Sequence, residues 1–190
     1  MRAILFLLLT SYAFAESNFD FSKKFSGTFN GKKLEYTAKV YEKVIFERDD
    51  STKPLASFVV TEYSVSNQKN RPVMFSFNGG PGSASLWLHM GVLGPKVVKV
   101  PSDASDDGSP PYNLINNKLS PLDKADLVFI DPIGTGYSRP LGEHEGKEFW
   151  GVKQDAVVIA EFIRRWINDN KRWNSPCLLY TSDAADDRYR

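Results

Sequence analysis

Hydrophobic and polar residues alternate in the first part of the chain, a pattern typical of strands with one buried face. Within Gly27 to Tyr63, four apolar residues alternate with polar neighbours: Leu34, Tyr36, Ala38 and Val40. Asn30-Gly31 is typical of a two-residue hairpin turn. A second strand-like segment covers Ser57 to Tyr63, and a polar loop from Ser64 to Asn70 follows it. We therefore expect the chain to begin with antiparallel strands.

Short apolar runs separated by glycine and proline follow. Pro72 to Phe77 is expected to form a strand that leads directly into Asn78-Gly79-Gly80-Pro81-Gly82. A short helix is expected over Ser85 to Met90, and Gly94-Pro95 ends it before a strand candidate at Lys96 to Val100.

The second half of the chain predicts a buried strand and a long helix. Pro101 to Pro111 is rich in Asp, Ser, Gly and Pro, as surface loops are. Asp126 to Ile130 is nearly continuous in apolar residues, like a strand of a parallel sheet that is buried on both faces. From Glu148 to about Asn170, apolar residues recur at helical spacing: Phe149, Val152, Ala156, Ile159, Ala160, Ile163 and Ile167. The order of these elements predicts an α/β fold with a mixed sheet and helical cover.

Composition and charge narrow the classes of partner. The 190 residues are 42% hydrophobic and 13% aromatic, which is a globular composition. Acidic and basic residues nearly cancel, with a formal net charge of +1. Charge therefore suggests neither a nucleic-acid partner nor an anionic membrane surface.

The first fifteen residues predict a secretory signal peptide. Arg2 gives the positive start, Ala3 to Leu9 is apolar, and Ala13-Phe14-Ala15 is a small-x-small cleavage site. A buried first helix or a membrane anchor is the alternative, but a span needs about 20 apolar residues. We expect a mature product that begins near Glu16, is exported to the periplasm or outside the cell, and has no membrane partner.

The chain's cysteine and histidine content limits its chemistry. Cys177 is the only cysteine, so no intramolecular disulfide can form. No cluster of histidines, cysteines or carboxylates has ligand spacing in the sequence, and neither a metal nor a cofactor is expected.

The loop Asn78-Gly79-Gly80-Pro81-Gly82 is the clearest candidate for chemistry. It lies where a strand ends and a helix is about to begin, which is where α/β folds place ligands. Its glycines let the backbone come close to a substrate and direct N–H groups toward it. In an α/β-hydrolase this loop supplies one of the two oxyanion-hole amides. A tight turn without a ligand is the alternative.

The surrounding residues resemble one family. Phe75 to Ser85 is similar to the strand-to-loop signature of serine carboxypeptidases. Three further segments match this family in order: Leu93-Gly94-Pro95, Pro111-Tyr112-Asn113 and Leu127 to Ser138. The resemblance runs from about Arg71 to Pro176 and implies the α/β-hydrolase fold.

The resemblance implies roles for four residues. Gly80 matches the glycine whose backbone N–H forms half of the oxyanion hole. Asn78 matches the asparagine that helps to bind the free α-carboxylate of the last peptide residue, and Gly79 matches a glycine whose amide assists it. Tyr137 is a candidate for lining the substrate pocket, with a buried packing role as the alternative.

Two residues depart from the family pattern. Ser83 stands where many secreted eukaryotic members have a cysteine, consistent with a disulfide-free, bacterial-type member. Val92 stands where well-known members have a glutamate that shares in binding the substrate carboxylate. The second departure weakens the case for strict C-terminal specificity.

The sequence contains no Gly-x-Ser-x-Gly nucleophile elbow. Its nearest approach is Gly136-Tyr137-Ser138-Arg139-Pro140, where proline replaces the last small residue, so Ser138 is rejected as nucleophile. His89 and His144 do not fit the order Ser, Asp, His and are expected to be surface or structural residues.

The end of the chain departs from the family. The match breaks at Cys177, shortly before the expected elbow, and residues 177–190 are interpreted as a non-native tail, with a divergent but genuine terminus as the alternative. The expected division is therefore a signal peptide at 1–15, the N-terminal part of an incomplete α/β-hydrolase domain at 16–176, and the tail.

The implied function is serine-type carboxypeptidase activity on peptide or protein C-termini through an acyl-enzyme, with this fragment inactive alone because its triad is missing. An acyltransferase of the same fold and an exported non-catalytic peptide-binding protein are alternatives. A proline-aminopeptidase-like hydrolase ranks third, since that family typically has histidine where this chain has Asn78.

Overall fold

Three long antiparallel strands open the structure, a computed structural model that describes residues 19–66, 70–79, 82–101, 103, 105 and 109–181. They are β1 (Asp20–Phe29), β2 (Lys32–Phe46) and β3 (Pro54–Val65). The hairpin predicted at Asn30-Gly31 is confirmed, and both residues have positive φ, 47° and 80°. A two-residue turn of this kind matches the twist of the strands that it joins.

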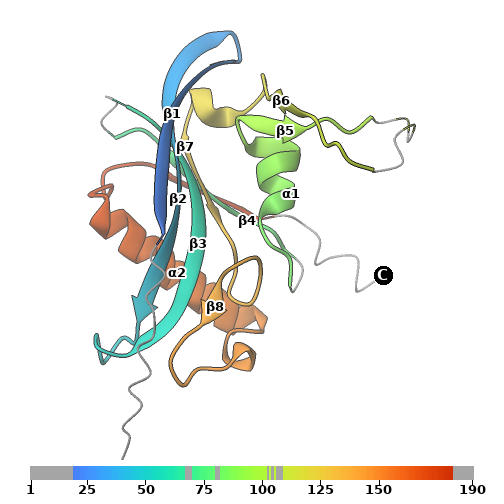
Figure 1. The fold of residues 1–190 in the computed structure, drawn as a ribbon. Helices are drawn as coiled ribbons and strands as arrows, with labels where there is room; N and C mark the ends of the chain where they lie inside the picture. The colour runs from blue at the N-terminus through green and yellow to red at the C-terminus, as the bar shows by residue number, and fades with distance from the viewer. Residues whose placement is uncertain are drawn as a thin grey trace, which may run out of the picture.

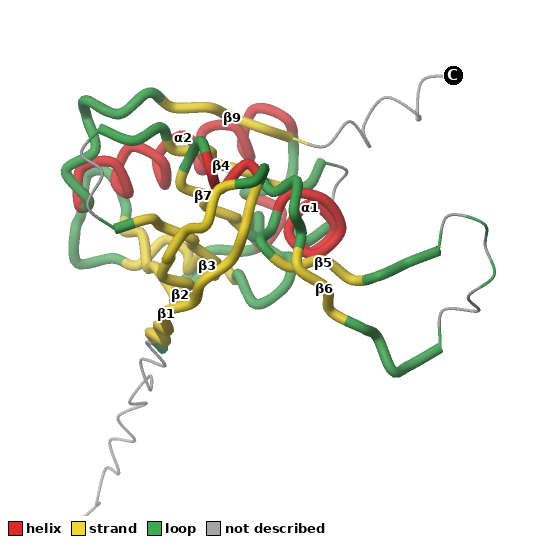
Figure 2. The backbone as a smooth tube through the Cα atoms, turned by 90° about the horizontal axis from the view of Figure 1, so that it is seen from above, coloured by secondary structure: helices red, strands yellow, loops and turns green. Residues whose placement is uncertain are grey.

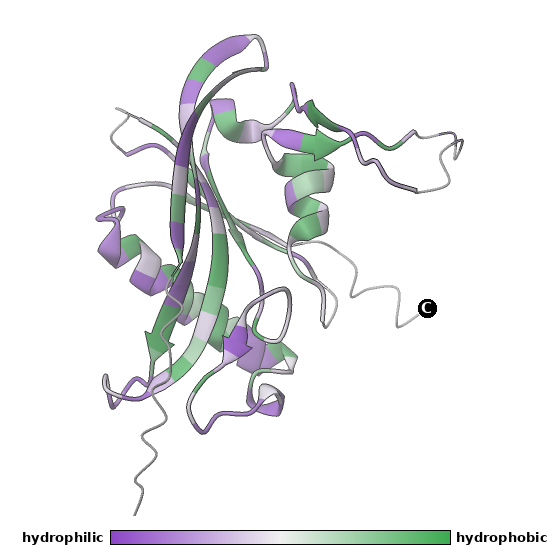
Figure 3. Cartoon of the chain, in the orientation of Figure 1, coloured by the Kyte–Doolittle hydropathy of each residue, from purple (hydrophilic) through white to green (hydrophobic). Residues whose placement is uncertain are grey.

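The central sheet is mixed, as predicted. Its order among the described residues is β1-β2-β3-β7-β4-β9, and β8 (Arg139–Pro140) pairs with β3. β4 (Val73–Phe77) lies parallel to both β7 (Asp126–Ile130) and β9 (Cys177–Thr181). Every residue of β7 is buried, so the prediction of a strand covered on both faces is confirmed. β1 and much of β2 are hydrophilic, whereas β3 is largely hydrophobic (Figure 3).

Helices cover the two faces of the sheet. α2 (Val152–Asp169) lies on one side of β4 and β7, and α1 (Leu86–Leu88) lies on the other, as Figures 1 and 2 show. α1 continues into the π-helical turn His89–Leu93. Two short 3-10 helices, Pro121–Asp123 and Gly146–Glu148, complete the helical segments of the described residues.

The buried face of α2 matches the predicted stripe only in part, since Ile159, Ile163 and Ile167 lie in or against the core but the helix also buries residues outside that stripe. Its largest buried side chains are Phe162 and Trp166, whose rings lie 4.9 Å from Phe58 and 5.2 Å from Phe75 between centroids. Val152, which the periodicity placed on the buried stripe, is 94% exposed. Two large aromatic rings bury more apolar area than valine and alanine do. The helix face that carries Phe162 and Trp166 therefore packs against the sheet.

The strand predicted at Lys96 to Val100 is shorter and pairs outside the central sheet. β5 (Lys96–Val98) is antiparallel to β6 (Leu114–Asn116), a strand that the sequence analysis missed. The two form a small ribbon beside α1 (Figure 1). Within the predicted loop between them, residues 102, 104 and 106–108 lie outside the described residues.

The expected boundary at Cys177 is not marked by a break in the structure. β9 begins there and extends the sheet at the edge of β4, with Val73 opposite Cys177 and Phe77 opposite Thr181. Residues 182–190 of the predicted tail and the predicted signal peptide at 1–15 lie outside the described residues. Within the described part of the chain, no helix is long and apolar enough to cross a membrane.

Candidate active site

The carboxyl ends of β4 and β7 bring the two signature segments together. Asn78 and Gly79 follow β4, and Asp131 follows β7. Since β4 and β7 are parallel neighbours, both segments emerge at the same edge of the sheet. In α/β folds this edge is where ligands bind.

Asn78 is oriented by the helix that follows the glycine loop. Its side chain is 8% exposed, and its Oδ1 accepts a hydrogen bond of 3.2 Å from the Leu88 backbone N–H in α1. This hydrogen bond points Oδ1 toward α1, so that the Nδ2 group points away from this helix. Nδ2 donates to none of the described residues. A neutral amide donor held in this way suits an anion.

Asp131 ties the end of the glycine loop to β7. Its Oδ1 accepts a hydrogen bond of 2.8 Å from the Ser85 backbone N–H, and Ser85 Oγ donates to the Ile130 carbonyl. Burial raises the pKa of the Asp131 carboxyl, while the Ser85 N–H acts in the opposite direction. The loop therefore has a fixed anchor four residues after Pro81.

Gly136 allows the second signature turn to approach this anchor. Its φ is +50°, and a Cβ at this position would lie 2.1 Å from Asp131 Oδ2 and 3.5 Å from Ala84 Cβ. Any other residue would displace the carboxylate, which explains why glycine stands here. The turn that carries Tyr137 is thus held against the glycine loop.

The comparisons with known proteins point to one family. A family model described as serine carboxypeptidase matches residues 50–181. Serine carboxypeptidase-like 10 of Arabidopsis thaliana is 29% identical over 125 residues, which cover 64% of this chain and 26% of that protein. A pheromone-processing carboxypeptidase of Saccharomyces cerevisiae is 33% identical over 102 residues, or 53% of this chain and 13% of that protein.

The chain belongs to the serine carboxypeptidase family. The family model covers more than half of it and contains both signature segments. The chain itself spans about a quarter or less of the length of the relatives named above. The match runs through residue 181 and so includes all of β9, beyond the boundary that the sequence analysis placed at Pro176.

The residues predicted for the serine carboxypeptidase site are only partly described. Asn78 and Gly79 lie at the end of β4, whereas Gly80, the predicted oxyanion-hole residue, lies outside the described residues. Tyr137 is 80% exposed on the turn beside Ala84. Such exposure does not fit a buried packing role and leaves the ring available to a ligand.

Ser138 is placed in a way that supports its rejection as nucleophile. It is fully buried, and its Oγ accepts a hydrogen bond of 2.9 Å from the Val59 backbone N–H. A nucleophile needs an exposed hydroxyl next to a base. Ser138 therefore links the signature turn to β3.

The two histidines have other partners. The Nε2 atom of His89 lies 2.6 Å from the Tyr63 hydroxyl, and its ring packs 4.7 Å from Phe129. His144 lies between two carboxylates, with 2.9 Å to Glu148 and 3.1 Å to Glu47. Neither ring is bonded to a serine, so neither forms a nucleophile–base pair in the described residues.

The sequence analysis missed three residues at this site. Asp131 lies in the second signature segment, but the sequence analysis gave it no role. An acidic residue directly after a buried strand could have indicated a role. Leu86 and Trp87 are 57% and 70% exposed on α1, next to the residue whose amide fixes Asn78. The sequence shows that two large apolar residues follow the glycine loop, but their exposure is known only from the structure. No metal-binding group of acidic, histidine or cysteine side chains occurs among the residues described.

Proposed function

We propose that this chain contributes substrate recognition to a serine-type carboxypeptidase of the α/β-hydrolase fold. The reaction is hydrolysis of a peptide bond at a free C-terminus through an acyl-enzyme, and the substrates are peptide or protein C-termini. The observation that carries the proposal is the orientation of Asn78, whose Oδ1 is used by Leu88 N–H while its Nδ2 remains available.

Each described part of the site has a role in this proposal. The Asn78 Nδ2 group donates to the substrate α-carboxylate, with the Gly79 amide beside it, and the Gly80 amide serves the oxyanion. Leu86 and Trp87 offer apolar contact area to the side chain of the substrate's last residue, and Tyr137 contacts the substrate from the second turn.

The nucleophile and its base are assigned to other residues. Ser138 is buried, and both histidines hold other partners, so these residues do not supply them. We accordingly expect the 190-residue chain alone to bind the substrate carboxylate without hydrolysing the peptide. Export to the periplasm or the extracellular space, based on the predicted signal peptide at 1–15, is part of the same proposal.

Calorimetric titration of the chain with acetyl-Leu-Phe and with its C-terminal amide tests this function. The free acid should bind and the amide should bind about 10-fold more weakly or worse, because a hydrogen bond to a charged group contributes about 1.5–3 kcal/mol. Asn78→Asp should abolish the preference, since aspartate still accepts from Leu88 N–H but repels the carboxylate.

Asn174→Ala is the matched control, because Asn174 is exposed on the loop before β9. It should bind like the unchanged chain. Equal affinity for acid and amide, or an undiminished preference in Asn78→Asp, would argue against the proposed carboxylate site.

A further inference from the structure

A second candidate binding site lies on the opposite face of the sheet. It is a groove of about 730 Å³ between α2, the turn from β2 to β3, and the Gly146–Glu148 helix. This volume is in the range of ligand sites. Asn78 contacts α1, whereas this groove is lined by α2, and the two helices lie on opposite sides of β4 and β7 (Figure 2).

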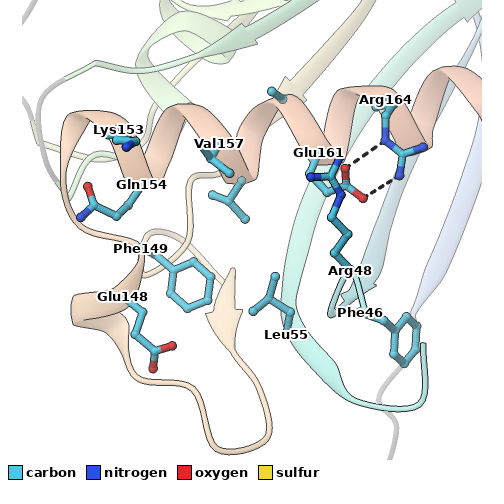
Figure 4. Close-up of a pocket in the computed structure, with 12 residues that line it drawn as sticks. Phe46, Arg48, Leu55, Glu148, Phe149, Lys153, Gln154, Val157, Glu161 and Arg164 are labelled. Atoms are coloured by element: carbon cyan, nitrogen blue, oxygen red, sulfur yellow. Dashed lines mark hydrogen bonds and ion pairs between the residues drawn. The ribbon is translucent and has the colours of Figure 1, made fainter. Parts of the chain in front are cut away.

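The floor of the groove is apolar and its walls are charged. Apolar side chains make up half of the lining: Phe46, Leu55, Phe149, Val157, Val158 and Ala160. Figure 4 shows Lys153 on the first turn of α2 and Arg48 beyond the end of β2, with Phe149, Leu55 and Val157 between them. Two cations therefore lie at separate ends of an apolar surface.

The carboxylates of the groove already have cationic or N–H partners. Glu161 accepts from Arg164 Nε at 2.9 Å and Nη2 at 2.7 Å, and from Arg165 Nε at 2.6 Å. Glu148 lies 2.9 Å from the His144 ring and accepts from the Glu145 backbone N–H at 2.6 Å. Glu161 is thus ion-paired with two arginines, and Glu148 is held by hydrogen bonds.

Arg48 and Lys153 have no such partners. Neither forms a hydrogen bond or an ion pair with any residue that the structure describes, while Arg164 is occupied by Glu161. The uncompensated charge of the groove is thus positive and lies at its two ends. A ligand that presents two separated anionic groups would match it.

We propose that this groove binds a peptide segment in which apolar residues are flanked by acidic residues. The apolar side chains cover Leu55, Phe149 and Val157, and the two carboxylates pair with Arg48 and Lys153. A single phosphate headgroup would need both cations side by side, and a membrane surface would need protruding rather than recessed apolar residues. An acidic peptide fits both the separation of the charges and the apolar floor.

Titration of the isotope-labelled 190-residue chain with a short peptide, acetyl-Glu-Leu-Phe-Leu-Glu-amide, tests the proposal by NMR. The blocked C-terminus excludes the Asn78 site, so failure here is distinct from failure of the proposed function. Amide shifts should cluster in residues 46–55 and 146–164. The corresponding peptide with lysine in place of glutamate should produce none of these shifts.

Charge-reversal variants test the role of the two cations. Arg48→Glu and Lys153→Glu should each weaken binding about tenfold, because a reversal removes an attraction and adds a repulsion. Lys33→Glu, at an exposed lysine at the start of β2, should leave the affinity unchanged. Binding should also weaken in about 1 M NaCl, where the Debye length is about 3 Å.

Several results would overturn the proposal. These are equal binding of the acidic and basic peptides, an equal loss in Lys33→Glu, or shifts centred on Asn78 and Tyr137. Sedimentation with phosphatidylserine vesicles that depends on Arg48 and Lys153, without peptide binding, would assign the groove to a membrane instead. Self-association that the same two variants abolish would assign it to a second copy of the chain.

Discussion

At the scale of single residues, His89 is a titratable group held against aromatic side chains. It follows α1, its Nε2 contacts the Tyr63 hydroxyl at 2.6 Å, and its ring lies against Phe129. Burial lowers the pKa of His89 to about 4. The folded state therefore favours neutral His89 throughout the range in which a solvent-exposed histidine gains a proton.

This placement predicts a stability loss in acid. Because the folded pKa is depressed, the unfolded chain binds the proton first, and His89 destabilises the fold as pH falls from about 6.5 toward 4, by up to about 3 kcal/mol. His89→Gln retains a polar group for Tyr63 without titrating. Urea unfolding at several pH values should show a smaller acid loss in this variant.

The pKa of His144 is shifted in the opposite direction to that of His89. Hydrogen bonds to Glu148 and Glu47 raise the pKa of His144, so its stabilising contribution is present at low pH and is lost as pH rises through the folded pKa. His144→Gln should therefore make the acid loss larger. Parallel pH profiles in the two variants would contradict the assigned environments.

At the scale of elements, a buried ionic network joins the amino ends of three parallel strands. Asp126, at the start of β7, accepts from Arg71 Nε and Arg172 Nη1, each at 2.9 Å, and from Val65 N–H at 3.0 Å. Arg71 precedes β4, and Arg172 lies in the turn before β9. One carboxylate thus fixes the start of β4, β7 and β9.

Removing this carboxylate should be costly. Asp126→Ala removes the carboxylate that pairs with the buried Arg71 guanidinium and should reduce the free energy of unfolding by about 3–5 kcal/mol. Asp169→Ala is the control, since Asp169 forms an exposed pair with Lys43 at 2.5 Å and should cost less than about 1 kcal/mol. Similar costs in chemical unfolding would show that the network does not join the strands.

The elements themselves were largely predictable from local patterns. Alternation identified β2 and β3, and the continuous apolar run of β7 identified the buried centre of the sheet. The face of α2 was predicted in part: Ile159, Ile163 and Ile167 lie in or against the core as expected, but the two largest buried side chains were not in the predicted set. Only contact with Phe58 and Phe75 decides that Phe162 and Trp166 point inward.

At the scale of the whole molecule, the site depends on contacts between segments that are distant in sequence. The position of Asn78 at the end of a strand was predictable, but the direction of its amide was not, since this depends on where α1 places the Leu88 N–H. The bond from Ser85 N–H to Asp131 likewise requires that β4 and β7 be parallel neighbours. Sequence patterns do not contain this pairing.

The same reasoning applies at the edge of the sheet. Residues 177–181 were separated from the family on sequence alone, yet β9 pairs with β4 along its whole length and the family match includes it. A strand of five residues is recognised only from its pairing with a neighbour. The pairing of β9 begins where Val73 N–H donates to the Pro176 carbonyl at 2.9 Å.

The side-chain amide resonance of Asn78 gives the most direct test of the proposed carboxylate site. In the ¹⁵N-labelled chain, acetyl-Leu-Phe should shift the Nδ2 protons of Asn78 strongly, while the C-terminal amide of the same peptide should not, because only the free carboxylate accepts from Nδ2. An unchanged Asn78 resonance at saturating free acid, or equal shifts with acid and amide, would contradict the account.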